Sequence, residues 1–486
     1  MPPAFPRYRL LAPLLLATSL FSAEPPIDLG TRRELFVDQF LIARLEGVQL
    51  KLHEPRREGI ALKFDEPWEG PFCAYVTVIK DGDLYRMYYR GKPDAGKGSI
   101  KREVTCYAES KDGIVWTKPH LELFEVMGTR ENNVILPNQD LYNEGFAPFL
   151  DTRPNVAPDE RYKALTRTKQ GKGGLIPLAS ADGIHWRVLQ TDPMITEGNF
   201  DSQNVAFWSA SEGCYVAYFR VNPKINGTII RLISRTTSAD FIHWTQPVRM
   251  EYGDRPLEQL YTSATHPYFR APHIYIALPK RFFPDKVALS SEQAKALVKD
   301  PNYRIASSDS VLMTTRGGNH YERTFMEAFI RPGPDPEDWI SRDNQPAMGV
   351  VPGNAREMFI YRLSHYAQPS IHLFRYSLRT DGFISVNAPY QGGEMVTRLV
   401  QFSGKTLEIN FNSSAAGGLR VEIQDAEGNP IPGYALADSP EVIGDEITHV
   451  ITWKEKGTDL SSLSGRPVRL RFVMHDADLY SLRFAP

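Results

Sequence analysis

Seven residues, SADGIHW, occur at Ser180–Trp186 and return almost unchanged as SADFIHW at Ser238–Trp244. Three more distant relatives place the copies about 60 to 75 residues apart along the chain. The five copies are Ser110–Trp116 (SKDGIVW), Ser180–Trp186, Ser238–Trp244, Thr314–Tyr321 (TTRGGNHY) and Arg379–Ser385 (RTDGFIS). This spacing is too wide for a solenoid repeat but suits a four-stranded blade with its loops.

The sequence before each copy is typical of short β-strands. The first unit has FCAYVTVIK, a DGD turn, LYRMYYRG and VTCYAES, and the third unit has NVAFWSA, CYVAYFRV and IRLISRTTS in the same order. One short helix, SSEQAKALVKD, is expected after a serine cap in the fourth unit. Five such units with almost no helical pattern predict an all-β fold, a five-bladed β-propeller.

The heptapeptide itself is expected to be structural. Its Asp and Gly suit a tight turn between the third and fourth strands of a blade, and its Trp can pack between neighbouring blades. The copies therefore fix the register of the blades and carry no catalytic role.

The chain is expected to divide into three parts. Residues 1–23 have two arginines, an apolar run and small residues, as in a secretory signal peptide, and predict a secreted or periplasmic protein. Residues 24–391 would form the propeller, and its early segment LFVDQFLIARLEGVQLKLHEP is expected to cover or close the first blade, although Asp38 there can also reach the site. Residues 392–486 lack the repeat, alternate apolar and polar residues, and predict a C-terminal β-sandwich.

Charge and hydrophobicity exclude some partners. The net charge of -2 gives no basic excess for nucleic acid, and no run is long enough to span a membrane. The three cysteines, Cys73, Cys106 and Cys214, lie in apolar runs and are expected to be buried free thiols, with a Cys73–Cys106 bridge as the alternative. We expect a monomer or a small homo-oligomer.

Chemistry is expected where the innermost strands begin, because these positions converge at one mouth of the central channel. A carboxylate stands just before the inner strand of four blades: Glu69, Glu144, Asp201 and Glu258. Asp343 and Asn344 occupy the matching place in the fifth. Like charges gathered in a cleft raise some pKa values and leave other groups ionised, which separates an acid from a base. Two of the four acids are thus candidate catalytic groups for cleaving a glycosidic bond.

At the level of architecture, this propeller with acids at the head of successive inner strands resembles the glycoside hydrolases of families 32, 43 and 68. The resemblance implies a carbohydrate substrate, with Glu69 as nucleophile or base, Glu144 as transition-state stabiliser and Asp201 as general acid. The order of acids here is Glu, Glu, Asp where those families have Asp, Asp, Glu, and their short motifs are missing. Glu258 can replace one of the three.

Basic and aromatic residues near the same mouth are candidate substrate-binding groups, although the arginines can equally pair with the inner acids. They are Arg90, Arg167, Arg220, Arg235, Tyr261, His266 and Arg281, with Lys280, Arg362 and His365 as further candidates. Trp68, Trp208 and Tyr142 can stack on a sugar or pack within the blades.

No metal or cofactor is expected, because the histidines show no HxH or HExxH spacing; a calcium or halide ion in the channel stays open. Two alternatives to hydrolysis also stay open. One is a propeller that binds carbohydrate without cleaving it. The other is a glycoside phosphorylase with one carboxylate and a cluster such as Arg220, Arg235, His266 and Arg281 around phosphate.

Overall fold

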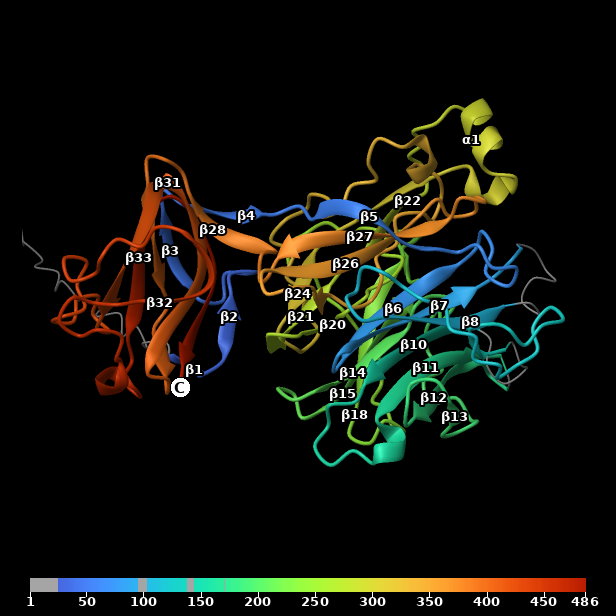
Figure 1. The fold of residues 1–486 in the computed structure, drawn as a ribbon, viewed down its shortest axis with the longest axis horizontal. Helices are drawn as coiled ribbons and strands as arrows, with labels where there is room; N and C mark the ends of the chain where they lie inside the picture. Colours follow the sequence, from blue (N-terminus) through green and yellow to red (C-terminus); the bar gives the residue numbers. More distant parts are fainter. Residues whose placement is uncertain (1–24, 95–102, 138–143, 170) are drawn as a thin grey trace, which may run out of the picture.

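The computed structural model describes residues 25–94, 103–137, 144–169 and 171–486, so the predicted signal peptide at residues 1–23 lies outside the described residues. The chain is almost entirely β-structure and forms two bodies joined by two extended connections (Figure 1). The larger body holds five β-sheets around a common centre, which confirms the predicted five-bladed propeller.

The first three blades each contain four antiparallel strands in chain order. Blade 1 comprises β6 (Ala74–Asp81), β7 (Leu84–Gly91), β8 (Val104–Ser110) and β9 (Val134–Leu136). Blade 2 comprises β10 (Glu144–Leu150), β11 (Tyr162–Thr168), β12 (Gly174–Ser180) and β13 (Arg187–Val188). Blade 3 comprises β14 (Val205–Ser209), β15 (Cys214–Val221), β18 (Leu232–Ser238) and β19 (Val248–Arg249), with a small hairpin of β16 (Lys224–Ile225) and β17 (Thr228–Ile229).

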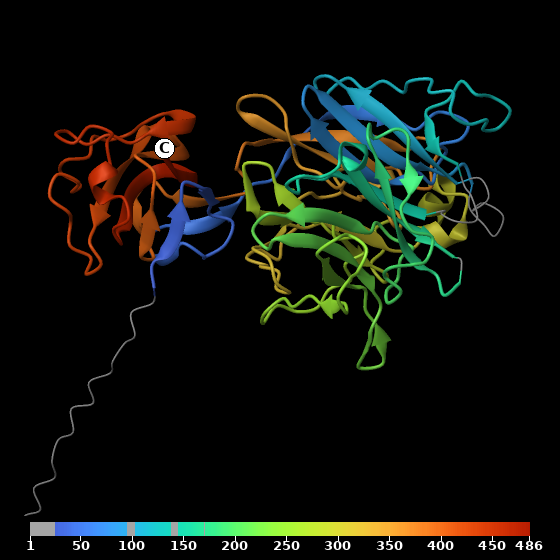
Figure 2. The same cartoon turned by 90° about the horizontal axis from the view of Figure 1, so that it is seen from below.

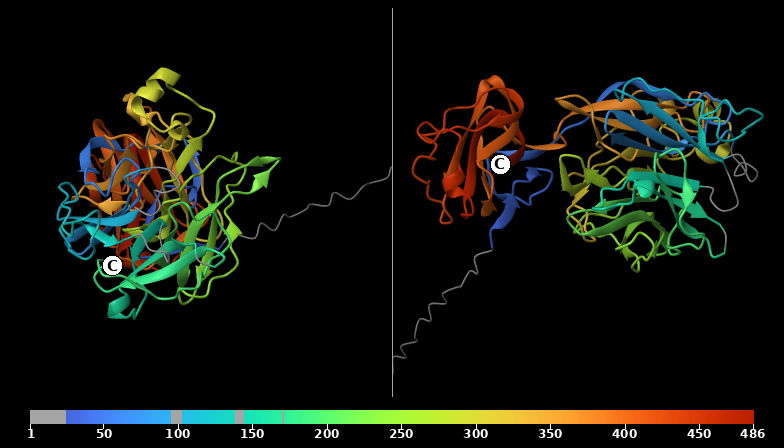
Figure 3. Two further views of the ribbon diagram at one scale, coloured as in Figure 1. Left: turned by 90° about the vertical axis from the view of Figure 1, so that its right-hand side faces the viewer. Right: turned by 60° about the horizontal axis from the view of Figure 1, so that its bottom comes forward.

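Blades 4 and 5 depart from this pattern. Blade 4 comprises β20 (His266–Tyr268), β21 (Ala271–Ala277) and β24 (Met313–Thr315), extended by the pair β22 (Lys280–Phe283) and β23 (Ser307–Ser310). The helix α1 (Ser291–Leu297) projects from this blade and starts at the predicted cap, Ser290 (Figure 3). Blade 5 comprises β25 (Val351–Pro352), β26 (Glu357–Ser364), β27 (His372–Arg379) and, as its outer strand, β5 (Arg56–Lys63) from the other end of the chain. β5 therefore closes the ring on the fifth blade.

The heptapeptide forms the predicted turn after the third strand. In the second copy, Asp182 Oδ1 accepts hydrogen bonds from the backbone N–H groups of Ile184 and His185 at 2.9 and 2.8 Å. Trp186 packs against Tyr88 of blade 1, with ring centroids 6.4 Å apart, so it lies between neighbouring blades as predicted. In the fifth copy no fourth strand follows the turn, because the chain leaves for the C-terminal body and β5 takes the vacant edge.

These turn bonds predict a modest loss of stability on truncation. We expect Asp182→Ala to lower the free energy of unfolding by about 1 to 2 kcal/mol, because two backbone N–H groups lose a charged acceptor at a partly exposed site. Urea denaturation measures the change, and Asp192→Ala, at an exposed position in the same blade, is the matched control. An unchanged urea midpoint for Asp182→Ala contradicts the assignment.

The C-terminal body contains strands from both ends of the chain, which corrects the expected boundaries. β1 (Ile27–Gly30), β2 (Arg33–Leu35), β3 (Ile42–Glu46) and β4 (Gln49–Leu52) pair with β30 (Val400–Phe402), β33 (Arg469–Ala485), β29 (Gly393–Thr397) and β28 (Ile384–Ala388), respectively. β31 (Thr406–Gln424) and β32 (Asp445–Val450) complete it. The early segment thus does not close the first blade, because its partners lie more than 300 residues later (Figure 2).

Ion pairs connect the two bodies. Glu34 of β2 has no exposed side-chain surface and accepts hydrogen bonds from His273 and Arg316 of blade 4, at 2.9 and 2.8 Å. Arg316 also donates to Asp38 at 2.8 Å, so Asp38 lies at this interface. Burial alone would raise the pKa of Glu34, but the His273 hydrogen bond and the Arg316 charge lower that pKa to about 2.

This shift predicts acid sensitivity at the interface. Because the folded pKa of Glu34 lies below the unfolded value of about 4.3, its contribution of about 3 kcal/mol is present above that value and is lost as the pH falls toward 2. We expect the stability gap between the wild type and Glu34→Gln to narrow as the pH falls from about 5 to about 2. Denaturant titrations at several pH values measure the gap, and a constant gap contradicts the prediction.

Candidate active site

The inner strands of the blades begin at one mouth of the propeller. A series of side-chain contacts runs around this mouth, and we describe it from blade 3 onward. Asp201, just before β14, forms an ion pair with Arg220 of β15. The Arg220 guanidinium lies 4.8 Å from the ring centroid of Tyr261, which precedes the inner strand of blade 4. Lys280 Nζ lies 4.3 Å from the centroid of the same ring. Asp201 keeps about half of its side chain, 54%, exposed to solvent.

Further contacts lead from blade 4 through blade 5 and back to blade 1. Lys280 donates to the backbone oxygen of Arg342 at 2.9 Å, and the Arg342 guanidinium lies 4.8 Å from the Tyr303 ring centroid. The Tyr303 and Tyr366 rings are 5.6 Å apart, and Arg90 Nη2 donates to the Tyr366 hydroxyl at 3.4 Å.

Blade 1 closes the circuit. The Arg90 guanidinium lies 4.6 Å from the Tyr75 ring centroid, and the Tyr75 hydroxyl donates to the backbone oxygen of Asp201 at 3.0 Å. We call this closed series of contacts the mouth ring. Its members are Asp201, Arg220, Tyr261, Lys280, Arg342, Tyr303, Tyr366, Arg90 and Tyr75.

The mouth ring contains four basic side chains and one acid. Burial lowers the pKa of Lys280 well below its ordinary value, and the charge of Arg342 lowers it further. Arg220 is 5% exposed, and its Nε and Nη1 atoms are buried without a hydrogen-bond partner among the described residues. Arg231 adds a further positive charge 5.6 Å from the Tyr261 ring centroid. The described part of the mouth is therefore electropositive, with Asp201 as its accessible carboxylate.

A cavity of about 420 Å³ adjoins Asp201 between blades 2 and 3. Its lining includes Arg167, Lys169 and Lys172 as well as Asp201 and the glycines of the loop before β12. The cavity therefore continues the basic character of the mouth ring outward and has room for a sugar unit.

Glu144 begins β10 opposite Arg167, and its side chain lies outside the described residues. The next residue, Gly145, has a φ of +69°, and a Cβ added there would lie 2.5 Å from the backbone oxygen of Ser202. The backbone at Glu144 thus runs beside that of Asp201, and only glycine permits this approach.

Two of the predicted acids are held by cations away from the mouth ring. Glu69 has no exposed surface and accepts hydrogen bonds from Lys118 at 2.7 Å and Tyr89 at 2.5 Å. Burial raises the pKa of Glu69, although Lys118 opposes this shift. Glu258 pairs with Arg281 at 2.9 Å and Arg323 at 2.7 Å. Both carboxylates therefore form structural ion pairs with basic side chains.

Besides Arg167, which lines the cavity, three predicted binding residues lie outside the mouth ring. Arg235 pairs with Glu212, in the turn at the far end of β14, at 2.7 Å. Arg281 is bound by Glu258 and by Asp309, the latter at 2.6 Å. His266 is buried and accepts a hydrogen bond from the Val350 N–H group at 2.8 Å, which joins blades 4 and 5, and burial lowers its pKa to about 4.

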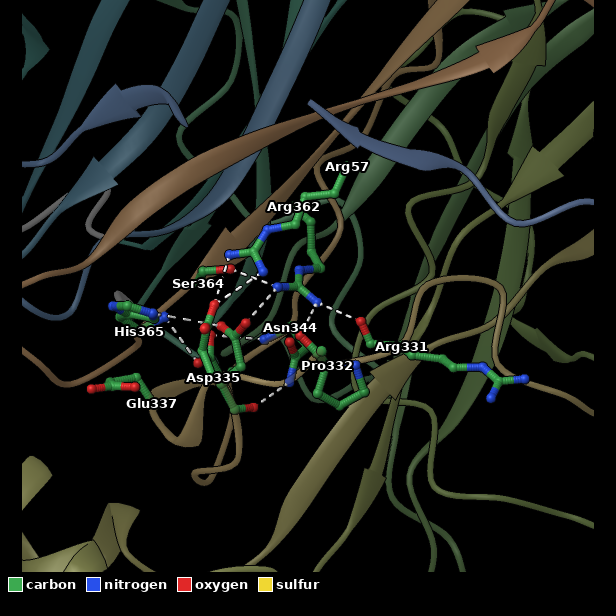
Figure 4. Close-up of polar contacts among 12 residues, drawn as sticks. Arg57, Arg331, Pro332, Asp335, Glu337, Asn344, Arg362, Ser364 and His365 are labelled. Atoms are coloured by element: carbon green, nitrogen blue, oxygen red, sulfur yellow. Dashed lines mark hydrogen bonds and ion pairs between the residues drawn. The ribbon is translucent and has the colours of Figure 1, made fainter. Parts of the chain in front are cut away.

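A buried polar network surrounds Arg362 of blade 5 (Figure 4). Arg362 pairs with Asp338 at 3.1 Å and donates to Ser364 at 2.7 Å. Burial and the nearby Asp338 raise the pKa of Asp343 to about 7, and Asp343 accepts from the His365 N–H group at 2.9 Å.

One group in this network has the donor types of a metal site. Ligand atoms of Asp335, Asp338 and His365 all lie within 4.8 Å of one another. Arg57 and Arg362 already bind one oxygen of Asp335 and of Asp338, respectively, so positive charge is supplied there by guanidinium groups.

Sequence reasoning missed Arg231, Arg342, Tyr75, Tyr303 and Tyr366. Arg342 stands directly before Asp343 in SRDNQ, so its position at the head of a blade was the available signal. Tyr303 and Tyr366 come from loops outside the repeat, and no periodicity marks them. All three cysteines are free, as expected; Cys73 and Cys106 are buried, whereas Cys214 is only half-buried. Among the described residues, no helix is long and apolar enough to cross a membrane.

Comparison with known proteins gives only distant similarity. No family model and no curated protein matches the chain. A solved structure described as a glycoside hydrolase is 11% identical, with a TM-score of 0.46, over 67% of this chain and 92% of that chain. An N-acetylgalactosamine deacetylase from F. plautii, in complex with blood group B trisaccharide, is 12% identical, with a TM-score of 0.43, over 69% and 96%. A thermostable family-43 glycoside hydrolase is 13% identical, with a TM-score of 0.42, over 65% and 94%. Similarity at this level carries no conclusion about the chemistry of this chain.

Proposed function

We propose that the propeller mouth is the active site of a glycoside hydrolase, with Asp201 and Glu144 as its two carboxylates. The observation that supports this proposal most directly is Asp201, a half-exposed acid set among tyrosine rings and guanidinium groups. Tyrosine faces can stack on sugar rings, and guanidinium groups can bind sugar oxygens.

Hydrolysis of a glycosidic bond needs a second acid within about 5 to 10 Å of the first. Glu144 is the candidate because its backbone runs beside Asp201, as the contact between Gly145 and Ser202 requires. Glu69 and Glu258 are not part of this proposal, since the Glu69 side chain has no exposed surface and the Glu258 side chain is 17% exposed and pairs with two arginines.

A panel of neutral and acidic polysaccharides, incubated with the full chain, tests the proposal through the sugars released. We expect new reducing ends from at least one class of glycan, and proton NMR of the fresh product gives the stereochemical outcome. Binding without release of sugar from any panel member would instead favour a propeller that only binds carbohydrate.

A further inference from the structure

The mouth ring holds more positive than negative charge. Arg220 and Arg342 lie against tyrosine rings, and Asp201 is the acid that contacts among the described residues bring into the ring. Buried charge is costly unless an opposite charge or hydrogen bonds compensate it. Among the described residues, that compensation is incomplete.

Two arginines show where the missing negative charge would lie. Arg220 uses Nη2 on Asp201, while its buried Nε and Nη1 have no partner among the described residues. The Arg342 guanidinium stacks on Tyr303 and forms no ion pair with the described residues. Each unused N–H group of a guanidinium can donate a charge-assisted hydrogen bond to a carboxylate or another oxyanion.

The cavity beside Asp201 extends this positive region toward solvent. Arg167, Lys169 and Lys172 lie on its wall, so a ligand that reaches from the cavity into the mouth ring passes basic groups along its path.

We infer that the mouth ring binds an oxyanion carried by the substrate, so that the preferred glycan is acidic, bearing uronate carboxylates or sulfate esters. The inference depends on the proposed function only where it calls the ligand a substrate. The oxyanion site itself rests on Arg220 and Arg342 alone. Free inorganic phosphate has the same binding chemistry, and the experiment separates it from a charged sugar.

Isothermal titration calorimetry at fixed ionic strength tests the inference with matched ligands. The probes are an oligosaccharide containing glucuronate, the same oligosaccharide after reduction of its carboxyl groups, a sulfated glycan with its desulfated form, and sodium phosphate alone. We expect an acidic form to bind at least about tenfold more tightly than its neutral partner, as a charge-assisted hydrogen bond implies. Equal affinity for both members of each pair overturns the inference.

Variants locate the effect. Arg342→Gln is expected to remove most of the preference for the acidic form, whereas Arg187→Gln, at an exposed ion pair in blade 2, keeps it. Arg220→Gln is a second variant, and thermal melting verifies that each variant is folded. Loss of affinity for acidic and neutral forms by the same factor contradicts the assignment.

The possible failures are distinguishable. Rapid cleavage of a neutral glycan with no charge preference overturns the inference and leaves the proposed function standing. Preferential binding of an acidic glycan without any cleavage supports the inference and contradicts the proposed function. Cleavage that requires phosphate identifies the anion as a co-substrate and overturns the assignment to a charged sugar.

Discussion

Asp201→Asn is expected to lower kcat on a cleaved glycan by about 10² to 10⁴-fold, the range for loss of a general acid or base. The amide has nearly the same shape as the carboxylate and can still accept a hydrogen bond from Arg220. It cannot transfer a proton or stabilise positive charge. Initial rates at saturating substrate measure the change, and KM is expected to change far less than kcat.

The control is Asp192→Asn, an exposed acid of blade 2 away from the mouth ring. Glu144→Gln should show a loss as large as that of Asp201→Asn if the two acids act as a pair. Turnover by Asp201→Asn within a factor of two of the wild type would rule out Asp201 as the acting group.

Lys118→Met is expected to cause the largest loss of stability, about 3 to 5 kcal/mol near neutral pH. Glu69 has no exposed surface, and removal of Lys118 leaves its charge buried with only the Tyr89 and Glu66 hydrogen bonds. Since burial already raises the pKa of Glu69, losing Lys118 should raise it further. The defect should therefore grow as the pH rises and shrink below about pH 4, where the carboxyl is protonated in both the folded and the unfolded state.

The double variant Lys118→Met with Glu69→Gln is the informative control. Removing both charges leaves polar groups that Tyr89 can still satisfy, so most of the lost stability should return. Urea denaturation at pH 5 and pH 8 measures all three proteins. A double variant as unstable as the single one would show that the buried charge is not the cause.

Sequence could predict the blades because the first three copies of the heptapeptide make their turns from local hydrogen bonds, such as those of Asp182. The same register located Asp201 and Tyr261, which lie in the loops before inner strands, and Arg220, which lies near the end of a second strand. It could not tell an acid at the mouth from one such as Glu69, because Lys118 reaches Glu69 from 49 residues along the chain.

The pairing of the chain ends had no local signal either. A strand such as β3 has the same alternation whether its partner is a neighbouring blade or β29. The Arg342 side chain was missed for a related reason, since its importance depends on Tyr303 and Lys280 from another blade.

The two extended connections between the bodies have a consequence for the order of folding. β1 to β4 find their partners only after residue 384, and β5 finds β27 only after residue 372. The first strands to be synthesised must therefore wait for the last, and neither body can be completed from one continuous stretch of chain. Contacts this distant in sequence slow folding, so we expect the two bodies to become protected from proteolysis together and late.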